Sequence, residues 1–516
     1  MYGQGPNREN SLFYAWGRGR ERGTAEKAVA KCMHPSPSSV ETGEPQVLTR
    51  HTTPHPSIDR GEPPTLRKNV HKRLRDRPVI YLTAGAGGMY CGSCLRDNAL
   101  VRHLRQAGVD AQLVPLYTPI RTDETDVSGD RLFFGGINIY CRHRWPWFAA
   151  LPMWLTGWLD APWLLRRVAA RSVETDAARL GRLTMAMLAG SSGPLKAHVG
   201  QLVKWLERER PALVNLSNLL IAGAVPQVKE RLGVPVVVTL QGDDLFLDQL
   251  ESDYRRPVLE RLQDLARYVD RFVVFSRFYQ HKMARMLDVA PERFENIPLG
   301  IDVADWRELN RNPRPQRPPT IGFLARAAPE KGLHVLIEAF IHMKTGSGID
   351  GSSSEEREAA RRCRLIVAGW NSGTGGSYAG EQRRRLEEAG CADHVQWWGE
   401  VDRPRKQAFF EAIDLLCVPM PYEEPKGLFV LEALACGVPV IVPAHGIFPE
   451  MLGELEGGWL LKSVEPRVVA EELSRRVVDL PGLRNRGAIG RERVLEKRTA
   501  QVMASATLDV YDRVLS

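Results

Sequence analysis

Short apolar runs alternate along most of this chain with longer segments in which apolar residues recur every three or four positions. The short runs fit strands buried on both faces of a parallel sheet, and the longer segments fit helices that pack one face against it. The predicted strands are residues 79–83, 111–116, 212–216, 234–240, 272–275, 365–369, 395–398, 415–418 and 438–442. The alternation of strands and helices predicts an α/β protein built from βαβ units.

A proline-rich stretch, RELNRNPRPQRPP, divides this alternation into two series and is typical of a linker. The first series begins just after Arg77, and the second opens with a strand, a turn and a helix at residues 320–340. The predicted parts are a first domain at 76–305, a linker at 306–319, a second domain at 320–490 and one last helix, about residues 491–514, within 491–516.

Residues 1–75 lack this pattern. They contain HPSPSS, TTPHPS and GEPPT and few aliphatic residues in sequence, so they cannot bury enough apolar surface to offset chain entropy. We predict a disordered tail. It carries 13 Lys and Arg against 7 Asp and Glu, which is six of the chain's eight net positive charges. The nearly neutral remainder argues against a nucleic-acid enzyme. Contact of the tail with anionic lipid and an over-extended start codon both fit this sequence.

The eight cysteines are scattered and do not form the spacing of a disulfide framework, which favours a reducing cytosol. Cys91 and Cys94 make one C-x-x-C, and no second pair lies at zinc-site spacing. The two are either small residues at a helix start or groups with redox or metal chemistry. The N-terminus lacks the residue order of a signal peptide, so we predict a cytoplasmic protein.

Residues 142–167, RHRWPWFAALPMWLTGWLDAPWLLRR, combine tryptophans and prolines, and between Trp145 and Arg166 the only charges are Asp160 and Arg166. Three prolines and a glycine disfavour a membrane-spanning helix. Three interpretations remain open: an insertion packed on the first domain, a lip that binds the acceptor, and a patch that lies on a membrane surface with basic flanks and interfacial tryptophans.

The most informative stretch is LLCVPMPYEEPKGLFVLEALACGVPVIVPAHGIFPE at residues 415–450, which reads as strand, loop, helix and strand. The helix is predicted to start near Pro425 and to end near Cys436. Its first backbone N–H groups, the glycine at 427 and the charge of Lys426 suit an anion. Glu424 and Glu432 bracket this position and suit sugar hydroxyls on either side of a diphosphate, although each alone could be an ordinary surface residue.

The segment EEPKGLFVLEALACGVPVI resembles the E-x7-E signature of the retaining GT-B glycosyltransferases, and most closely glycosyltransferase family 4, the group 1 glycosyltransferases. The resemblance implies two Rossmann-like domains that face each other across a cleft, with the last helix crossing back onto the first domain. It assigns Glu432 to the donor ribose and Glu424 to the transferred sugar. It assigns the donor diphosphate to the backbone of Gly427, Leu428 and Phe429. Lys426 departs from the family, which usually has an aromatic residue there.

The same resemblance assigns further residues. Arg326 and Lys331 match the pair that clamps the donor diphosphate, although either could be an ordinary loop charge. Gly87 and Gly88 match a Gly-Gly pair in the first loop, where the glycine pattern alone is a weak signal. The nucleotide side of the site is assigned to Gly369 and to the segment of Gly399 and Val401.

The strand at 234–240 ends in Gln241, Gly242, Asp243 and Asp244, at the end of a parallel strand where ligands bind. Many family 4 members have histidine where this chain has Gln241. Glutamine cannot hold a proton, so we expect a positioning role there rather than proton transfer. Asp243 and Asp244 are read either as a loop turn with one carboxylate that contacts the acceptor or as a remnant of a metal-binding D-x-D motif.

Together these features predict a metal-independent, retaining glycosyltransferase that moves a sugar from a UDP- or GDP-sugar to a glycan or lipid-linked acceptor. No cofactor beyond the donor is expected, and the catalytic residues are Glu424, Arg326, Lys331 and Gln241. A peripheral contact with the cytoplasmic membrane is one interpretation of the tail and the Trp-rich segment. Two alternatives are a protein of GT-B shape that binds a nucleotide sugar and transfers poorly, which Gln241 motivates, and a sugar-nucleotide epimerase.

Overall fold

A computed structural model describes residues 72–85, 91–129, 131–134, 177–308, 317–347, 351–369 and 378–516. All of these belong to one compact unit, Thr65–Ser516. The predictions for residues 1–71, for the Trp-rich segment, for Gly87 and Gly88 and for most of the linker lie outside the described residues.

The first sheet has six parallel strands in the order β2-β1-β3-β4-β5-β6. Its strands are β1 (Val79–Thr83), β2 (Ala111–Pro115), β3 (Leu213–Leu216), β4 (Val236–Thr239), β5 (Arg271–Val274) and β6 (Phe294–Asn296). Nearly every position of β1, β3 and β4 is buried, because helices cover both faces.

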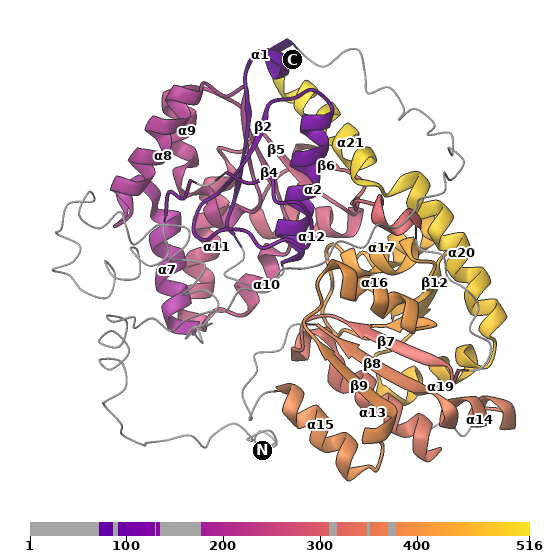
Figure 1. Ribbon diagram of the computed structural model, residues 1–516. Helices are drawn as coiled ribbons and strands as arrows, with labels where there is room; N and C mark the ends of the chain where they lie inside the picture. Colours follow the sequence, from indigo (N-terminus) through magenta and orange to yellow (C-terminus); the bar gives the residue numbers. More distant parts are fainter. Residues whose placement is uncertain are drawn as a thin grey trace, which may run out of the picture. The chain divides into compact units, whose positions relative to one another are not determined.

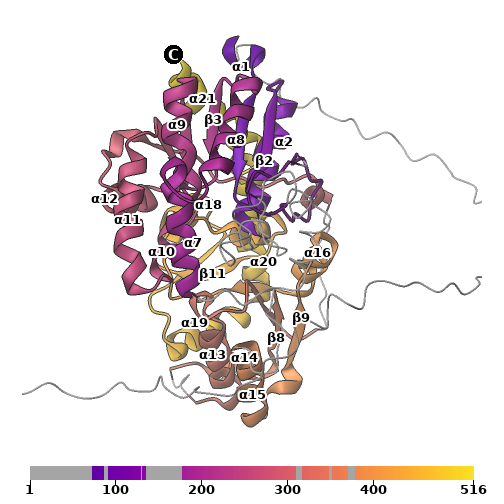
Figure 2. The ribbon, with the colours of Figure 1, turned by 90° about the vertical axis from the view of Figure 1, so that its left-hand side faces the viewer.

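The helices of this part are α1 (Lys72–Asp76), α2 (Gly92–Gln106), α7 (Ala177–Ala189), α8 (Lys196–Glu209), α9 (Val225–Leu232), α10 (Asp243–Asp248), α11 (Ser252–Ala266) and α12 (Arg277–Leu287). Helix α2 packs against β1 and β2 on one face. Helices α7, α8, α9 and α11 gather on the other side and face the viewer in Figure 2. The hydrophobic core on that side includes Leu202, Val214 and Val238.

The second sheet also has six parallel strands, in the order β12-β11-β10-β7-β8-β9 (Figure 1). Its strands are β7 (Thr320–Leu324), β8 (Arg364–Ala368), β9 (Val395–Gly399), β10 (Leu415–Cys417), β11 (Val440–Pro443) and β12 (Gly458–Leu461). Its helices are α13 (Leu333–Thr345), α14 (Ser354–Arg362), α15 (Tyr378–Glu388), α16 (Arg403–Ala412), α17 (Leu428–Ala435), α18 (Phe448–Leu455) and α19 (Pro466–Val477).

Two parallel sheets with helices on their faces confirm the predicted α/β class. Two edge strands were not predicted. β6 is only three residues long and β12 is only partly buried, so neither carries the apolar run that marks a central strand.

The end of the chain differs from the single predicted helix at about 491–514. It forms two helices, α20 (Leu480–Lys497) and α21 (Ala500–Leu515). The break lies at Thr499, whose hydroxyl caps α21 by accepting a hydrogen bond from the Val502 N–H. Next to the break, Ile301 donates to the Arg498 carbonyl at 3.0 Å and accepts from the Ala500 N–H at 2.7 Å. Helix α21 then packs along α2 of the first sheet, as Figure 1 shows.

Across the described residues, no helix is both long enough and apolar enough to cross a membrane.

Candidate functional site

The predicted site residues follow the carboxyl ends of strands in both sheets. Gln241 follows β4, Lys331 follows β7 and Glu424 follows β10. Open parallel sheets bind ligands at this edge. The loop after β4 and the loop after β10 approach each other closely. A β-carbon added at Gly242 would lie 3.7 Å from the Pro425 Cγ and 4.0 Å from the Tyr422 hydroxyl.

Helix α17 begins at Leu428, three residues after the predicted start at Pro425. Gly427 is its N-cap and has a φ of 69°, in the left-handed region that side chains with a β-carbon rarely adopt. This turn directs the free backbone N–H groups of the helix start toward the preceding loop, where Glu424 lies.

Glu424 uses both carboxylate oxygens at this helix start. Oε2 accepts from Lys331 Nζ at 2.7 Å, and Oε1 accepts from the backbone N–H groups of Lys426 at 3.3 Å and Gly427 at 3.4 Å. Burial by itself raises the pKa of Glu424, but the neighbouring Lys331, Lys426 and Gly427 N–H outweigh it and lower that pKa. The carboxylate is therefore ionised at neutral pH and is a hydrogen-bond acceptor.

The two predicted cations are placed differently. The Lys331 ammonium contacts Glu424 and lies 5.5 Å from the centroid of the Tyr422 ring. Arg326, on the turn that follows β7, is paired with Glu330, and its side chain is 38% exposed. Of these two residues, Lys331 is therefore the one that lies at the start of α17.

Glu432 lies one turn into α17 and belongs to a buried cluster that joins the two sheets. Lys406 donates to Glu432 Oε1 at 2.7 Å and pairs with Asp123 Oδ2, from the segment after β2, at 2.8 Å. Although burial lowers the pKa of Lys406, the carboxylates of Glu432 and Asp123 raise it to about 12. Lys406 thus holds the carboxylate that the family resemblance assigns to the ribose.

The loops after β7, β8 and β9 meet at Gly369. Its N–H donates to the Gly399 carbonyl at 2.8 Å, and a β-carbon on it would lie 1.8 Å from the Ala325 carbonyl oxygen, so only glycine fits. This contact sets the predicted nucleotide segment directly beside the turn that carries Arg326. Val401 follows this segment and is buried.

The start of α17 also faces the start of α2. Lys426 Nζ donates to Ser93 Oγ at 2.6 Å, and a β-carbon at Gly92 would lie 3.7 Å from Leu428 Cδ2. The Phe429 ring instead packs edge-on against Phe448, with centroids 6.0 Å apart. Leu428 therefore lies at the meeting of the two sheets, whereas the Phe429 side chain serves packing.

Cys91 is the N-cap of α2, and Cys94 lies in its first turn, both as free thiols. Both fit the interpretation as residues of a helix start. The described residues contain no group of three or more His, Cys, Asp or Glu side chains that could hold a metal ion.

Gln241 is 7% exposed and is tied to the first sheet. Its Nε2 donates to Asp97 Oδ1 and to the Ser217 carbonyl, each at 3.0 Å. Asp97 also accepts from Tyr81 at 2.9 Å and from Arg96 at 3.0 Å. Burial raises the pKa of Asp97, and the charge of Arg96 acts in the opposite direction.

Asp243 and Asp244 are buried and bound within the protein. Asp243 accepts from the backbone N–H groups of Leu219 at 2.7 Å and Gln241 at 3.2 Å, and burial raises its pKa to about 6. Asp244 accepts from the Tyr279 hydroxyl and pairs with Lys282, each at 2.8 Å. These bonds shape the loop that presents Gln241, and the predicted contact with an acceptor stays a prediction.

Sequence reasoning missed Asp97, Asp123 and Lys406. A signal existed for Asp97, since it stands three residues after Cys94 on the helix face that continues with Val101 and Leu104, where an apolar residue is expected. Asp123 and Lys406 lie nearly 300 residues apart in sequence and carried no comparable signal.

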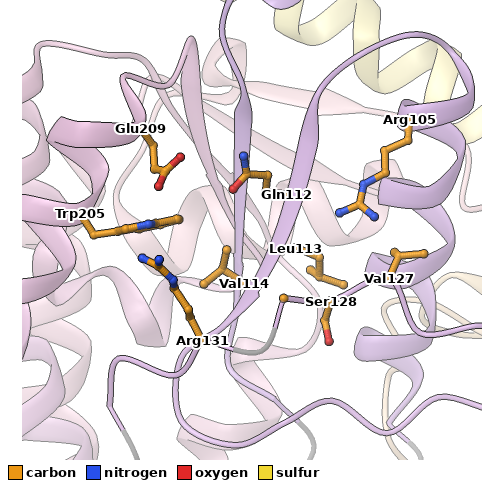
Figure 3. A pocket seen from close by; sticks show the side chains of 10 residues that line it. Arg105, Gln112, Leu113, Val114, Val127, Ser128, Arg131, Trp205 and Glu209 are labelled. Carbon is orange, nitrogen blue, oxygen red and sulfur yellow. The ribbon is translucent and has the colours of Figure 1, made fainter.

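A separate hollow of about 510 Å³ lies along the edge strand β2. Figure 3 shows Trp205, Arg131 and Gln112 among the side chains that line it. None of the predicted site residues lines it.

Two family models match adjacent parts of this chain. "Glycosyltransferase Family 4" matches residues 169–305, and "Glycosyl transferases group 1" matches residues 305–489. Together they cover more than half of the chain.

Curated relatives include a D-inositol 3-phosphate glycosyltransferase of Segniliparus rotundus, which is 28% identical over 327 residues, 60% of this chain and 67% of the relative. A GDP-mannose-dependent alpha-(1-6)-phosphatidylinositol monomannoside mannosyltransferase of Mycobacterium tuberculosis H37Rv is 26% identical over 267 residues, 49% of this chain and 64% of the relative. The matches span about two thirds of the length of these relatives.

Solved structures agree on the fold. Sucrose-phosphate synthase from Thermosynechococcus elongatus superposes with a TM-score of 0.58 at 18% identity and covers 85% of this chain and 99% of that one. HepE from Anabaena, in complex with UDP and glucose, superposes with a TM-score of 0.56 at 16% identity, over 84% and 99% of the two chains.

These matches confirm the family resemblance and, with the two parallel sheets, the predicted GT-B fold. They also bear out the expected enzyme class, since family 4 consists of retaining glycosyltransferases that use nucleotide sugars. This chain belongs to glycosyltransferase family 4, the group 1 glycosyltransferases.

Proposed function

We propose that this protein transfers a sugar from a UDP- or GDP-sugar, with retention of configuration, to a hydroxyl group of a glycan or lipid-linked acceptor. The observation that carries the proposal is the position of Glu424, whose carboxylate joins Lys331 to the backbone N–H groups at the start of α17. This cluster of positive charge suits the donor diphosphate. The ionised carboxylate within it suits the hydroxyls of the sugar.

In the proposed reaction, the bond between the anomeric carbon and the phosphate oxygen breaks. A bond from that carbon to the acceptor oxygen forms on the same face, and the leaving diphosphate takes the acceptor proton. Lys331, Arg326 and the start of α17 stabilise the negative charge on the departing oxygen. Because these groups supply the charge, the proposed reaction requires no metal ion.

The remaining donor contacts are assigned along the second sheet. Glu432, held by Lys406, accepts hydrogen bonds from the ribose hydroxyls. Gly369, Gly399 and Val401 line the nucleotide side. From the first sheet, Gln241 contacts the transferred sugar. The family resemblance assigns Gly87 and Gly88 to the donor phosphate.

Acceptors that carry inositol are the first to test. Two relatives are named for D-inositol 3-phosphate and for phosphatidylinositol monomannoside. Lys426 supports a phosphorylated acceptor. Its positive charge lies at the start of α2, where it contacts Ser93, and the backbone N–H groups of a helix start also favour an anion. Family members usually have an aromatic residue at this position.

A thermal-shift panel of UDP-, GDP- and ADP-sugars identifies the donor, because a ligand at a hundred times its Kd adds about 2.7 kcal/mol of stability. The bound donor is then incubated with D-inositol 3-phosphate, phosphatidylinositol and glycan acceptors. Mass spectrometry identifies the product, and NMR identifies its anomeric configuration and the sugar on the recovered nucleotide.

We expect sugar transfer with retained configuration, and slow donor hydrolysis without acceptor. Donor binding without hydrolysis or transfer would identify a binding protein instead. A changed sugar on the recovered nucleotide would identify an epimerase.

A further inference from the structure

The orientation of the Gln241 side-chain amide is fixed by its neighbours. The Ser217 carbonyl can only accept a hydrogen bond, and it lies 3.0 Å from one end of the amide. That end must therefore be the NH₂ group, which also lies 3.0 Å from Asp97 Oδ1. The other end is the carbonyl oxygen Oε1.

Oε1 accepts no hydrogen bond from any described residue, although it is shielded from solvent. A buried acceptor without a donor is costly, and in native proteins such a group usually has a reason. Gln241 precedes Gly242, where an added β-carbon would lie 3.7 Å from the Pro425 Cγ in the Glu424 loop. The Gln241 carbonyl oxygen without a donor thus lies where the loop after β4 approaches the loop after β10.

Asp97 is itself held rigidly. Tyr81 and Arg96 both donate to Oδ1, the oxygen that receives the Gln241 amide, and Thr83 donates to Oδ2 at 3.3 Å. The Arg96 and Asp97 side chains are fully buried, and the Arg96 guanidinium lies 5.1 Å from the centroid of the Phe275 ring. A buried ion pair of this kind stabilises little by itself and suits a role in specifying one arrangement.

We propose that Asp97 is a positioning residue, which holds the NH₂ group of Gln241 so that its carbonyl oxygen accepts a hydrogen bond from a hydroxyl of the donor sugar. Arg96 and Tyr81 keep Asp97 in place. The inference rests on the proposed function for its ligand, a nucleotide sugar, and it concerns discrimination between the nucleotide sugar and the nucleotide alone.

The test compares binding of UDP-glucose with UDP, and of GDP-mannose with GDP, by calorimetry on the full chain. The variants are Q241L, which removes the acceptor, and R96M/D97L, which replaces the ion pair with apolar side chains and leaves no buried charge. Their combination completes a double-mutant cycle. T83V is the matched control, because it removes a hydrogen bond to Asp97 without touching the oxygen that receives Gln241.

We expect Q241L and R96M/D97L each to lower the preference for the nucleotide sugar by about tenfold, the value of one hydrogen bond. The combined variant should lose about tenfold in total, since the two changes remove one interaction. T83V should keep the wild-type preference, and affinity for the nucleotide alone should stay unchanged in all variants.

Three results would overturn the inference. They are an unchanged preference in R96M/D97L, losses that multiply in the combined variant, and a wild-type protein that binds nucleotide and nucleotide sugar equally. If R96M/D97L does not fold, Y81F takes its place, because it removes the Tyr81 hydrogen bond to Asp97 Oδ1 and keeps the ion pair. A wild-type protein that prefers the nucleotide sugar but transfers nothing would contradict the proposed function alone.

Discussion

Glu424 accepts hydrogen bonds from a lysine of one loop and from the backbone of another, so a single carboxylate organises the start of α17. Its two partners are the groups that the proposed reaction needs around the diphosphate. Lys331 makes this contact, whereas Arg326 is paired with Glu330 on its own turn. The two cations therefore differ in what their removal should cost.

Lys331→Ala should lower transfer by about 10²- to 10³-fold, because a preorganised charge at a departing oxygen is worth that much. Arg326→Ala should cost less, because its guanidinium is 38% exposed and already paired with Glu330. Release of the nucleoside diphosphate at saturating donor measures both, with thermal unfolding as a check of the fold. A fully active Lys331→Ala variant would refute the diphosphate clamp.

The lowered pKa of Glu424 predicts a dependence of stability on pH. A carboxyl group with a lowered pKa in the folded state contributes stability above its ordinary pKa of about 4.3, and that contribution is lost as the pH falls. Glu424→Gln should therefore lower the free energy of unfolding at pH 7, by an amount that shrinks below about pH 4, as the pH falls through the lowered pKa of Glu424.

Urea denaturation of both proteins at about pH 7, 5 and 3 measures this difference. A gap between the two proteins that stays constant over the three pH values would contradict the prediction.

Residues adjacent in sequence were the easier ones to predict. Glu424, Lys426 and Gly427 lie in one short segment, and the structure brings them together. The partners of Gln241 and Glu432 come from other parts of the chain, so only the fold could show Asp97 and Lys406 beside them. Arg326 could be placed on its turn but not in its ion pair, because the rotamer of a half-exposed arginine is not encoded in a motif.

Among the elements, α17 shows how one glycine sets the position of a helix start. Prediction put that start at Pro425, since proline is favoured at the first helical position. The left-handed Gly427 delays it to Leu428 and leaves Pro425 in the loop against Gly242. Strand positions were easier, because a run of buried apolar residues defines a central strand without reference to its neighbours.

Gly427→Ala should weaken binding of the nucleoside diphosphate, because the added β-carbon strains the left-handed turn and lies 3.2 Å from the Phe448 ring. Gly233→Ala is the matched control, since Gly233 has a φ of 62°, ends α9 and has open space around it. Both variants should lose about 1 kcal/mol of stability.

Only Gly427→Ala should change the Kd for UDP or GDP, as measured by calorimetry. If the two variants bound UDP or GDP with equal affinity, the start of α17 would have no role in diphosphate binding.

At the scale of the whole molecule, the sequence shows that net positive charge is concentrated near the N-terminus. Residues 65–75 contain five Lys and Arg and no Asp or Glu, so most of the tail's net positive charge lies in this short stretch. Residues 1–64 are nearly balanced, with eight basic and seven acidic residues. A contact with an anionic membrane surface would therefore depend on residues 65–75.

Vesicle co-sedimentation tests this contact. We expect the full chain to bind vesicles that contain phosphatidylglycerol, at about 1 kcal/mol for each basic residue near the surface, and salt to weaken the binding. Removal of residues 1–64 should preserve it. Replacement of the five basic residues by glutamine should abolish it, and equal binding by that variant would contradict the prediction.

The chain passes between the two sheets twice, near Ile301 and at Arg498–Thr499, and these passages are hydrogen-bonded to each other. Both covalent connections therefore share one pivot. We therefore expect the loops that carry Gln241 and Glu424 to open and close mainly by rotation about that point. Substrate entry then becomes an angular movement whose amplitude grows with distance from the paired segment.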